Sequence, residues 1–294
     1  MECFNPRNEE KVNQIKSLDK YKKLKSDYFL QTVFNNLEKK KSFGIIKYNK
    51  NIKKRINISI KDYKEFSENY SSIELEIKPA NNKFGQFINI KDEDKIYYHI
   101  YFNNNKEETN RNFINKDEQI KIIKIIIAHQ IKSFERLFEN CKCIKSIYFK
   151  RFFRNNINNM SYMFCECSLL KELNLNNFNT NNVNDMSNMF KGCSLLKELN
   201  LNNFNTNNVT DMNSMFFGCS SLKELNLNNF NTDNVTDMNF MFNGCSSLKE
   251  LNLNNFNTNN LIYMNCMFSG CSNELILKIK TQYKNLKEEA FKNN

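Results

Sequence analysis

The second half of the chain repeats one pattern of apolar and polar positions every 26 residues. A degenerate copy starts at Cys141, residues 120–140 fit an opening turn, and Leu277 and Ile279 fall on the leucine columns, so seven strand positions are predicted. Units this small cannot bury their apolar faces alone, and a fixed period of this length is typical of a solenoid of stacked coils. The period is clearest in one cysteine column: Cys167, Cys193, Cys219, Cys245 and Cys271.

Within one unit the spacing of the apolar positions changes. Leu199 and Leu201 alternate with polar residues, as expected for a strand with one buried face. Gly218 lies at the position of a left-handed helix C-cap. Each unit is therefore predicted to run strand, turn, short helix, turn, with the strands forming a parallel face. The residues between strand and glycine recur at the spacing of one helical face: Val209, Met212, Met215 and Phe216.

The repeat also resembles a known family. One unit reads Leu-Lys-Glu-Leu-Asn-Leu-Asn-Asn-Phe-Asn-Thr-Asn-Asn-Val-Thr-Asp-Met and closes with Met-Phe-x-Gly-Cys-Ser. This string is similar to the BspA-like (Treponema-pallidum-type) leucine-rich repeats of bacterial surface antigens and large protist families, over about residues 138–279. The resemblance implies a curved α/β leucine-rich-repeat solenoid and a role in cell-surface display, adhesion or protein binding, without catalytic residues.

The first 118 residues follow different rules. Residues 1–25 are charged and are predicted to be flexible. Residues 26–118 are predicted to form a small α+β capping domain that hides the apolar first edge of the solenoid. Residues 119–280 then form the solenoid, and residues 281–294 form a C-terminal helical tail or cap. The capping domain is expected to contain a helix from Ser26, an apolar segment at 43–48, and strands near 56–60, 73–77, 87–90 and 96–102.

Composition and charge narrow the function classes. Residues 1–150 hold 31 basic and 20 acidic residues, whereas residues 151–294 hold 12 of each, so the net charge of +11 lies in the first half. Its lysines are interleaved with acids, and we expect no nucleic-acid site because such a site needs a basic patch. No stretch approaches the ~18 apolar residues of a membrane span, and the chain starts without an apolar signal region. A cytoplasmic, monomeric protein is expected.

The residue types that most often carry chemistry fit structural roles. The cysteine column is expected to stack as reduced thiols roughly 5 Å apart. The pairs Cys141/Cys143 and Cys165/Cys167 lack the C-x₂-C spacing of zinc sites, so no metal, disulfide or cofactor is expected. The glutamates of the strand face form a repeated row, which favours a solvated row over an active site. The asparagines beside them are expected to form amide ladders between coils.

Two columns differ between copies while nearly every other column is fixed. One holds Lys191, Phe217 and Asn243, and the other includes Phe240. A position that accepts lysine, phenylalanine or asparagine is not expected to face the core. The variation indicates either neutral drift on an exposed face or a binding surface in which Phe217 and Phe240 form an aromatic patch. The candidate protein-binding residues are Lys191, Phe217, Phe240 and Asn243.

These observations favour a non-enzymatic repeat scaffold that binds a protein partner. Two alternatives stay open. The first, implied by the family resemblance, is a cell-surface adhesin or antigen. The second is a substrate adaptor of a ubiquitin ligase, in which residues 26–50 form an F-box-like docking helix and the solenoid binds the substrate.

Overall fold

The computed structural model describes residues 54, 72–128, 130–152 and 156–293. The chain divides into two compact units, Met1–Tyr70 and Ser71–Asn294. The predicted flexible segment 1–25, the F-box-like segment 26–50 and the strand at 56–60 lie outside the described residues and stay predictions.

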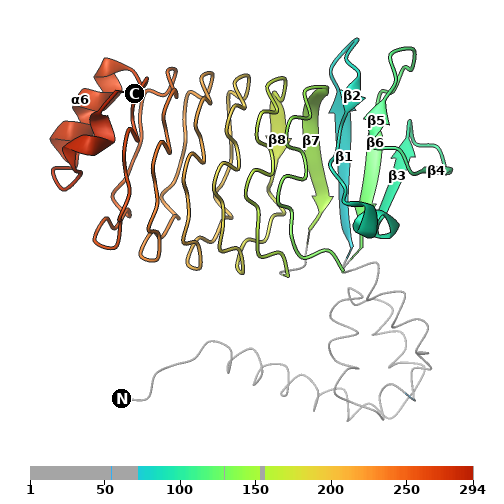
Figure 1. Ribbon diagram of the computed structural model, residues 1–294, viewed down its shortest axis with the longest axis horizontal. Helices are drawn as coiled ribbons and strands as arrows, with labels where there is room; N and C mark the ends of the chain where they lie inside the picture. Colours follow the sequence, from blue (N-terminus) through green and yellow to red (C-terminus); the bar gives the residue numbers. More distant parts are fainter. Residues whose placement is uncertain (1–53, 55–71, 129, 153–155, 294) are drawn as a thin grey trace, which may run out of the picture. The chain divides into compact units, whose positions relative to one another are not determined.

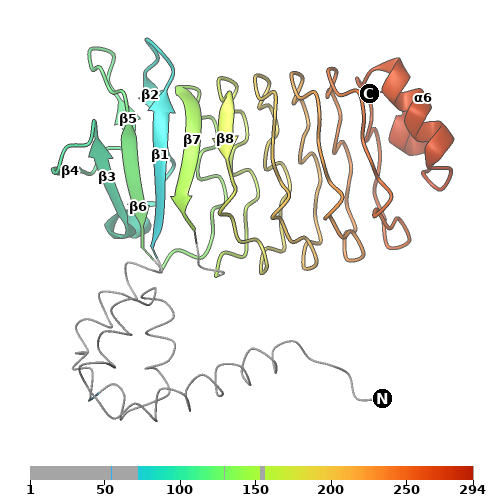
Figure 2. The ribbon, with the colours of Figure 1, turned by 180° about the vertical axis from the view of Figure 1, so that it is seen from behind.

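The second unit begins with a six-stranded sheet in the order β4-β3-β6-β1-β7-β8 (Figures 1 and 2). The predicted strand at 73–77 is confirmed as β1, and that at 96–102 is confirmed from residue 98 onward as β3. The prediction at 87–90 is wrong, because these residues form no strand. Phe87 and Ile88 are nevertheless completely buried. The strands are β1 (Ile73–Pro79), β3 (Tyr98–Phe102), β4 (Glu108–Thr109), β6 (Ile123–Ile127), β7 (Ile144–Arg151) and β8 (Glu172–Asn174). Besides these, β2 (Gly85–Gln86) pairs with β5 (Phe113–Ile114), and the 3-10 helix η1 (Asp92–Tyr97) precedes β3.

Strand β1 joins this sheet to the repeats. It pairs antiparallel with β6 on one side and with β7 on the other, and only β7 and β8 pair in parallel. On its outer face Glu74 forms ion pairs of 2.8 Å with Lys124 and with Arg151, one from each neighbouring strand. The opening turn at 120–140 was expected to supply the first strand of the parallel face, which is wrong, because β6 instead pairs antiparallel with β1 and β3. The period defines which side chains face inward but not which strand becomes the neighbour.

The repeats contain no helix within the described residues 156–271, so the predicted α/β unit is wrong. Instead, the Ser214 and Phe216 N–H groups donate to the next coil, at Asn239 O (2.8 Å) and Met241 O (2.9 Å). The Met215 N–H between them turns back to Met212 O at 3.2 Å. Phenylalanine rings of successive coils stack 5.6–5.7 Å apart, whereas a helix with its side chains is roughly 10 Å wide. One helix per coil does not fit, and the curvature implied by the family resemblance stays a prediction.

The core is built from ladders that run along the coils. Phe138, Phe164, Phe190, Phe216, Phe242 and Phe268 stack in sequence, and Phe291 closes the row at 5.4 Å. The thiols of the cysteine column donate to carbonyls of the preceding coil, for example Cys219 Sγ to Phe190 O at 3.1 Å. A buried carbonyl thereby gains a partner, which gives the cysteines a structural role as small apolar residues with a donor.

Asparagine side chains connect the coils along the strand side. Asn200 Nδ2 donates to Asn176 Oδ1 at 3.3 Å, and Asn226 Nδ2 donates likewise to Asn202 Oδ1 of its preceding coil at 3.2 Å. The predicted amide bonds between coils are confirmed, but they join the two asparagine columns rather than run within one. A column that the sequence did not single out contributes more, because Asn203 Nδ2 donates to the carbonyls of Leu175 (3.0 Å) and Phe178 (2.7 Å). Beyond β8 the described coils form no further strand, although Leu199 and Leu201 are buried as the alternation predicts.

The chain end closes the array differently from the prediction. Leu277 and Ile279 were expected in a closing strand, but they lie in α6 (Asn273–Gln282), where Leu277 is 65% exposed and Ile279 is buried. The Ser272 side chain caps this helix by accepting from the Leu275 N–H at 3.2 Å. The 3-10 helix η2 (Glu288–Phe291) follows, and its Ala290 carbonyl accepts from the Phe268 N–H of the last coil at 2.9 Å.

Candidate functional site

The two variable columns form one stripe along the turn side of the coils. We call these twelve residues the variable stripe. Extending the columns backward adds residues of the degenerate copies that the sequence analysis missed, and the 26-residue period was the signal that locates them. The stripe comprises Arg136, Tyr162, Asn188, Ser214, Phe240 and Cys266 in the first column, and Glu139, Cys165, Lys191, Phe217, Asn243 and Ser269 in the second.

Every residue of the first column has a left-handed backbone. Their φ angles lie between 52° and 58°, and none of the six is glycine. Four residues further along each coil a second left-handed position occurs, and there four of six copies are glycine, such as Gly218 at φ 70°. A left-handed conformation costs a residue other than glycine about 1–2 kcal/mol. The first column therefore keeps side chains where glycine would relieve the backbone. Three of these side chains, Asn188, Ser214 and Cys266, are at most 9% exposed and have structural positions.

Three of the four predicted residues meet in this stripe. The Phe217 and Phe240 rings lie 6.5 Å apart between centroids and 69° from parallel, and Lys191 Nζ lies 5.2 Å from the centre of the Phe217 ring. Both phenylalanines are half-buried, so they are less exposed than the sequence indicated. Asn243 is 9% exposed, and its Nδ2 donates to Cys266 O at 3.3 Å. Its position is thus that of a structural residue beneath the cluster.

The first coils carry a second, charged cluster in the same stripe. The Arg136 guanidinium lies 4.2 Å from the centre of the Tyr162 ring and binds both Glu139 oxygens at 2.8 and 2.9 Å. The Glu139 carboxylate raises the pKa of Arg136 above its ordinary value. The stripe therefore presents a charged end and an aromatic end, each formed by contacts between neighbouring coils.

Burial makes most of the described thiols poor nucleophiles. Burial raises the pKa of Cys219 to about 12 and that of Cys143 to about 11, and a thiol nucleophile must first lose its proton. His99 Nδ1 lies 3.0 Å from the exposed Glu108 carboxylate in the β3–β4 hairpin. Within the described residues no three histidine, cysteine or carboxylate side chains gather as metal ligands.

Three aspartates of successive coils form a carboxylate row. Asp185, Asp211 and Asp237 are linked by parallel bridges, and Asp211 Oδ1 accepts the Asn213 N–H at 2.8 Å. Burial raises the pKa of Asp211, and Asp185 and Asp237 raise it further, against the lowering by the Asn213 N–H. The folded state thus favours protonated Asp211, so the stability linked to this proton is present at low pH and is lost as pH rises through the folded pKa.

We expect Asp211→Asn to stabilise the protein at neutral pH by ~0.2–1 kcal/mol, because facing like charges cost about this much. The gain should vanish below the ordinary carboxyl pKa of 3.8, where Asp211 itself is neutral. Thermal melting at both pH values measures it. Asp233→Asn is the control, since asparagines occupy its column in the neighbouring coils. A loss of stability at pH 7 in Asp211→Asn would contradict repulsion in the row.

The columns, ladders and left-handed turns recur every 26 residues through the described coils, and the comparison with known families finds the same periodic region. A family described as "Mycoplasma protein of unknown function, DUF285" matches residues 110–200, 132–224 and 196–292. The chain belongs to this family. The three overlapping DUF285 matches together cover more than half of the 294 residues. No curated protein and no solved structure matches the chain. The family establishes a repeat protein and assigns no activity.

Helices long and apolar enough to cross a membrane are not found in the part of the chain that the structure describes.

Proposed function

We propose that the chain is a non-enzymatic repeat scaffold that binds a protein partner through the variable stripe. The observation that carries the proposal is the cluster of Lys191, Phe217 and Phe240, which occupies two columns that vary between copies while nearly every other column is fixed. Partly exposed aromatic residues are enriched where proteins bind one another, and a few of them dominate the binding energy. The left-handed backbone of the first column adds support, because its cost is not relieved by glycine.

We further propose that the repeats are leucine-rich repeats of the BspA-like subtype. The support is the string from Leu196 to Met212 and the closing Met-Phe-x-Gly-Cys-Ser. In this proposal the fixed columns provide the rigid support and the variable stripe provides the specificity.

Replacing Phe217 and Phe240 together with serine is expected to abolish capture of the native partner. Proximity labelling in the native cell, with the wild type and the double variant compared, measures this. Because both rings are half-buried, the double variant should also lose ~2 kcal/mol of stability, so labelling is done well below its melting transition.

Leu277→Ser is the matched control, since Leu277 is a 65% exposed apolar residue on α6, outside the stripe. Partners retained by Leu277→Ser and lost by the double variant support the proposal. Partners retained by a folded double variant would contradict it.

A further inference from the structure

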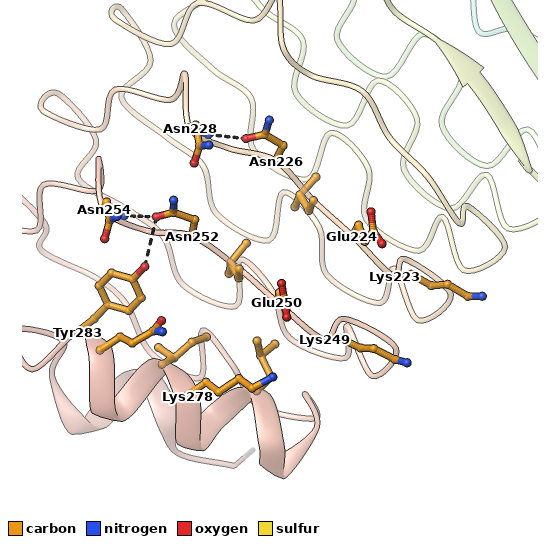
Figure 3. Close-up of a pocket in the computed structure, with 15 residues that line it drawn as sticks. Lys223, Glu224, Asn226, Asn228, Lys249, Glu250, Asn252, Asn254, Lys278 and Tyr283 are labelled. Carbon is orange, nitrogen blue, oxygen red and sulfur yellow. Dashed lines mark hydrogen bonds between the residues drawn. The ribbon is translucent and has the colours of Figure 1, made fainter.

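Helix α6 and the coils before it enclose a groove of about 1090 Å³ at the end of the strand side (Figure 3). Its floor holds matching residues of two successive coils: Lys223 and Lys249, then Glu224 and Glu250, then two rows of asparagines. In Figure 3 the two glutamates extend side by side from neighbouring coils, and Lys278 rises from α6 toward Glu250. The groove thus presents a regular set of polar groups against one helical wall.

Specific contacts hold the helical wall in place. Leu275 and Ile279 of α6 are each 1% exposed, and Tyr283 follows the helix as its C-cap. The Tyr283 hydroxyl accepts the Leu253 N–H at 2.9 Å and donates to Asn252 Oδ1 at 3.3 Å. The corner between strand side and helix is therefore already formed, which lowers the entropic cost of binding.

The charged floor of the groove is left without ion pairs inside the described chain. Lys278 pairs with Glu274, which does not line the groove, at 2.9 Å. Glu224 and Glu250 have no ion pair within 4.0 Å among the described residues, and the same holds for Lys223 and Lys249. Ammonium, carboxylate and amide groups follow one another along the floor, and the lining carries three lysines against two glutamates.

We propose that this groove binds a neutral oligosaccharide. A sugar hydroxyl both donates and accepts, so a chain of hydroxyls matches mixed carboxylate, amide and ammonium groups. The four aliphatic lining residues (Leu225, Leu251, Leu275 and Ile279) are each at most 7% exposed. These four side chains therefore offer little surface on which an apolar side chain of a protein or peptide could anchor.

Charge disfavours polymers that carry charge of a single sign. A nucleic acid or an acidic polysaccharide would bring its negative groups against Glu224 and Glu250, and a basic peptide would meet three lysines. A neutral chain avoids both conflicts and uses both kinds of group as hydrogen-bond partners. This site is separate from the variable stripe and stands whether or not the stripe binds a protein.

Titration of the full chain with cellohexaose, chitohexaose and maltohexaose, followed by calorimetry, tests the proposal. At least one of the three should bind. The double variant Glu224→Gln/Glu250→Gln should weaken that binding at least tenfold, since a hydrogen bond to a charged group is worth more than one to a neutral amide. Glu198→Gln is the matched control, because Glu198 occupies the same row one coil earlier and does not line the groove. It should bind as the wild type does.

A heparin hexasaccharide and an extended peptide with alternating lysine and glutamate serve as competing probes. The proposal is overturned if none of the neutral probes binds, or if a competing probe binds at Glu224 and Glu250 and the neutral ones do not. It is equally overturned if Glu198→Gln weakens binding as much as the double variant, since the helical wall would then be irrelevant. An unchanged melting transition of each variant confirms that all of them are folded.

Discussion

Replacing Phe216 with alanine is expected to lower the free energy of unfolding by ~3–5 kcal/mol, the range for a large-to-small change in a packed core. Phe216 is completely buried and stacks between Phe190 at 5.6 Å and Phe242 at 5.7 Å. The backbone on both sides is bonded to neighbouring coils, so the coil cannot collapse into the cavity. Chemical denaturation monitored by circular dichroism measures the loss.

The neighbouring residue is the control. Phe217→Ala removes the same atoms one position along, but Phe217 is half-buried and contacts Phe240 and Lys191 at the surface. Its cost should stay near ~1 kcal/mol, about half the ~1.5–3 kcal/mol transfer value of a fully buried apolar side chain, because no closed cavity is left behind. Equal losses for the two variants would show that the stripe belongs to the core. A small loss for Phe216→Ala would show that the phenylalanine stack adapts to a missing ring.

Deleting residues 1–118 is expected to abolish soluble folded protein. The deletion removes β1, which pairs with β6 along five positions and with β7 along six, and it leaves β6 with neither of its partners. Ile123, Ile125 and Ile127, which are completely buried, would become exposed. Unpaired strands with apolar faces associate with one another, so aggregation should follow. Size-exclusion chromatography of the expressed fragment measures it.

Deleting residues 1–71 is the matched control, because every strand of the six-stranded sheet lies after residue 72. This shorter deletion should give a monomer with a cooperative melting transition. A folded, monomeric product of the longer deletion would show that the repeats do not need β1. Aggregation of the shorter one would show that they depend on Met1–Tyr70.

The sequence predicted which residues are buried better than it predicted the path of the backbone. Leu199 and Leu201 of the strand side are buried, as their alternation with polar residues indicated. The spacing of Val209, Met212, Met215 and Phe216 also fits their complete burial, yet the segment is a series of turns. Both conformations place these side chains inward. The distance between coils decides between them, and that distance is a property of the assembled array.

The variable stripe could be predicted in part from the sequence, whereas the groove could not. The aromatic end of the variable stripe appeared as positions that change between copies, whereas Arg136 and Tyr162 were hidden because their copies are degenerate. The groove was missed because residues 277 and 279 continue the leucine columns. The helix signals were a capping Ser272 and the four-residue spacing of Leu275 and Ile279. A cap ends a periodic pattern, so extrapolating the pattern fails there.

The bonds between coils have a consequence for how such a chain varies over generations. They reach no further than the adjacent copy, since the thiol bonds join residues 29 apart and the amide bonds of the strand side join residues 24–28 apart. Duplicating 78 nucleotides of coding sequence within the repeats would thus insert one more coil that every neighbour accepts. The six-stranded sheet and α6 would move apart by one ring spacing, 5.6–5.7 Å, with their own contacts unchanged. The number of repeat copies, which recombination can change, thus sets the distance between the six-stranded sheet and α6.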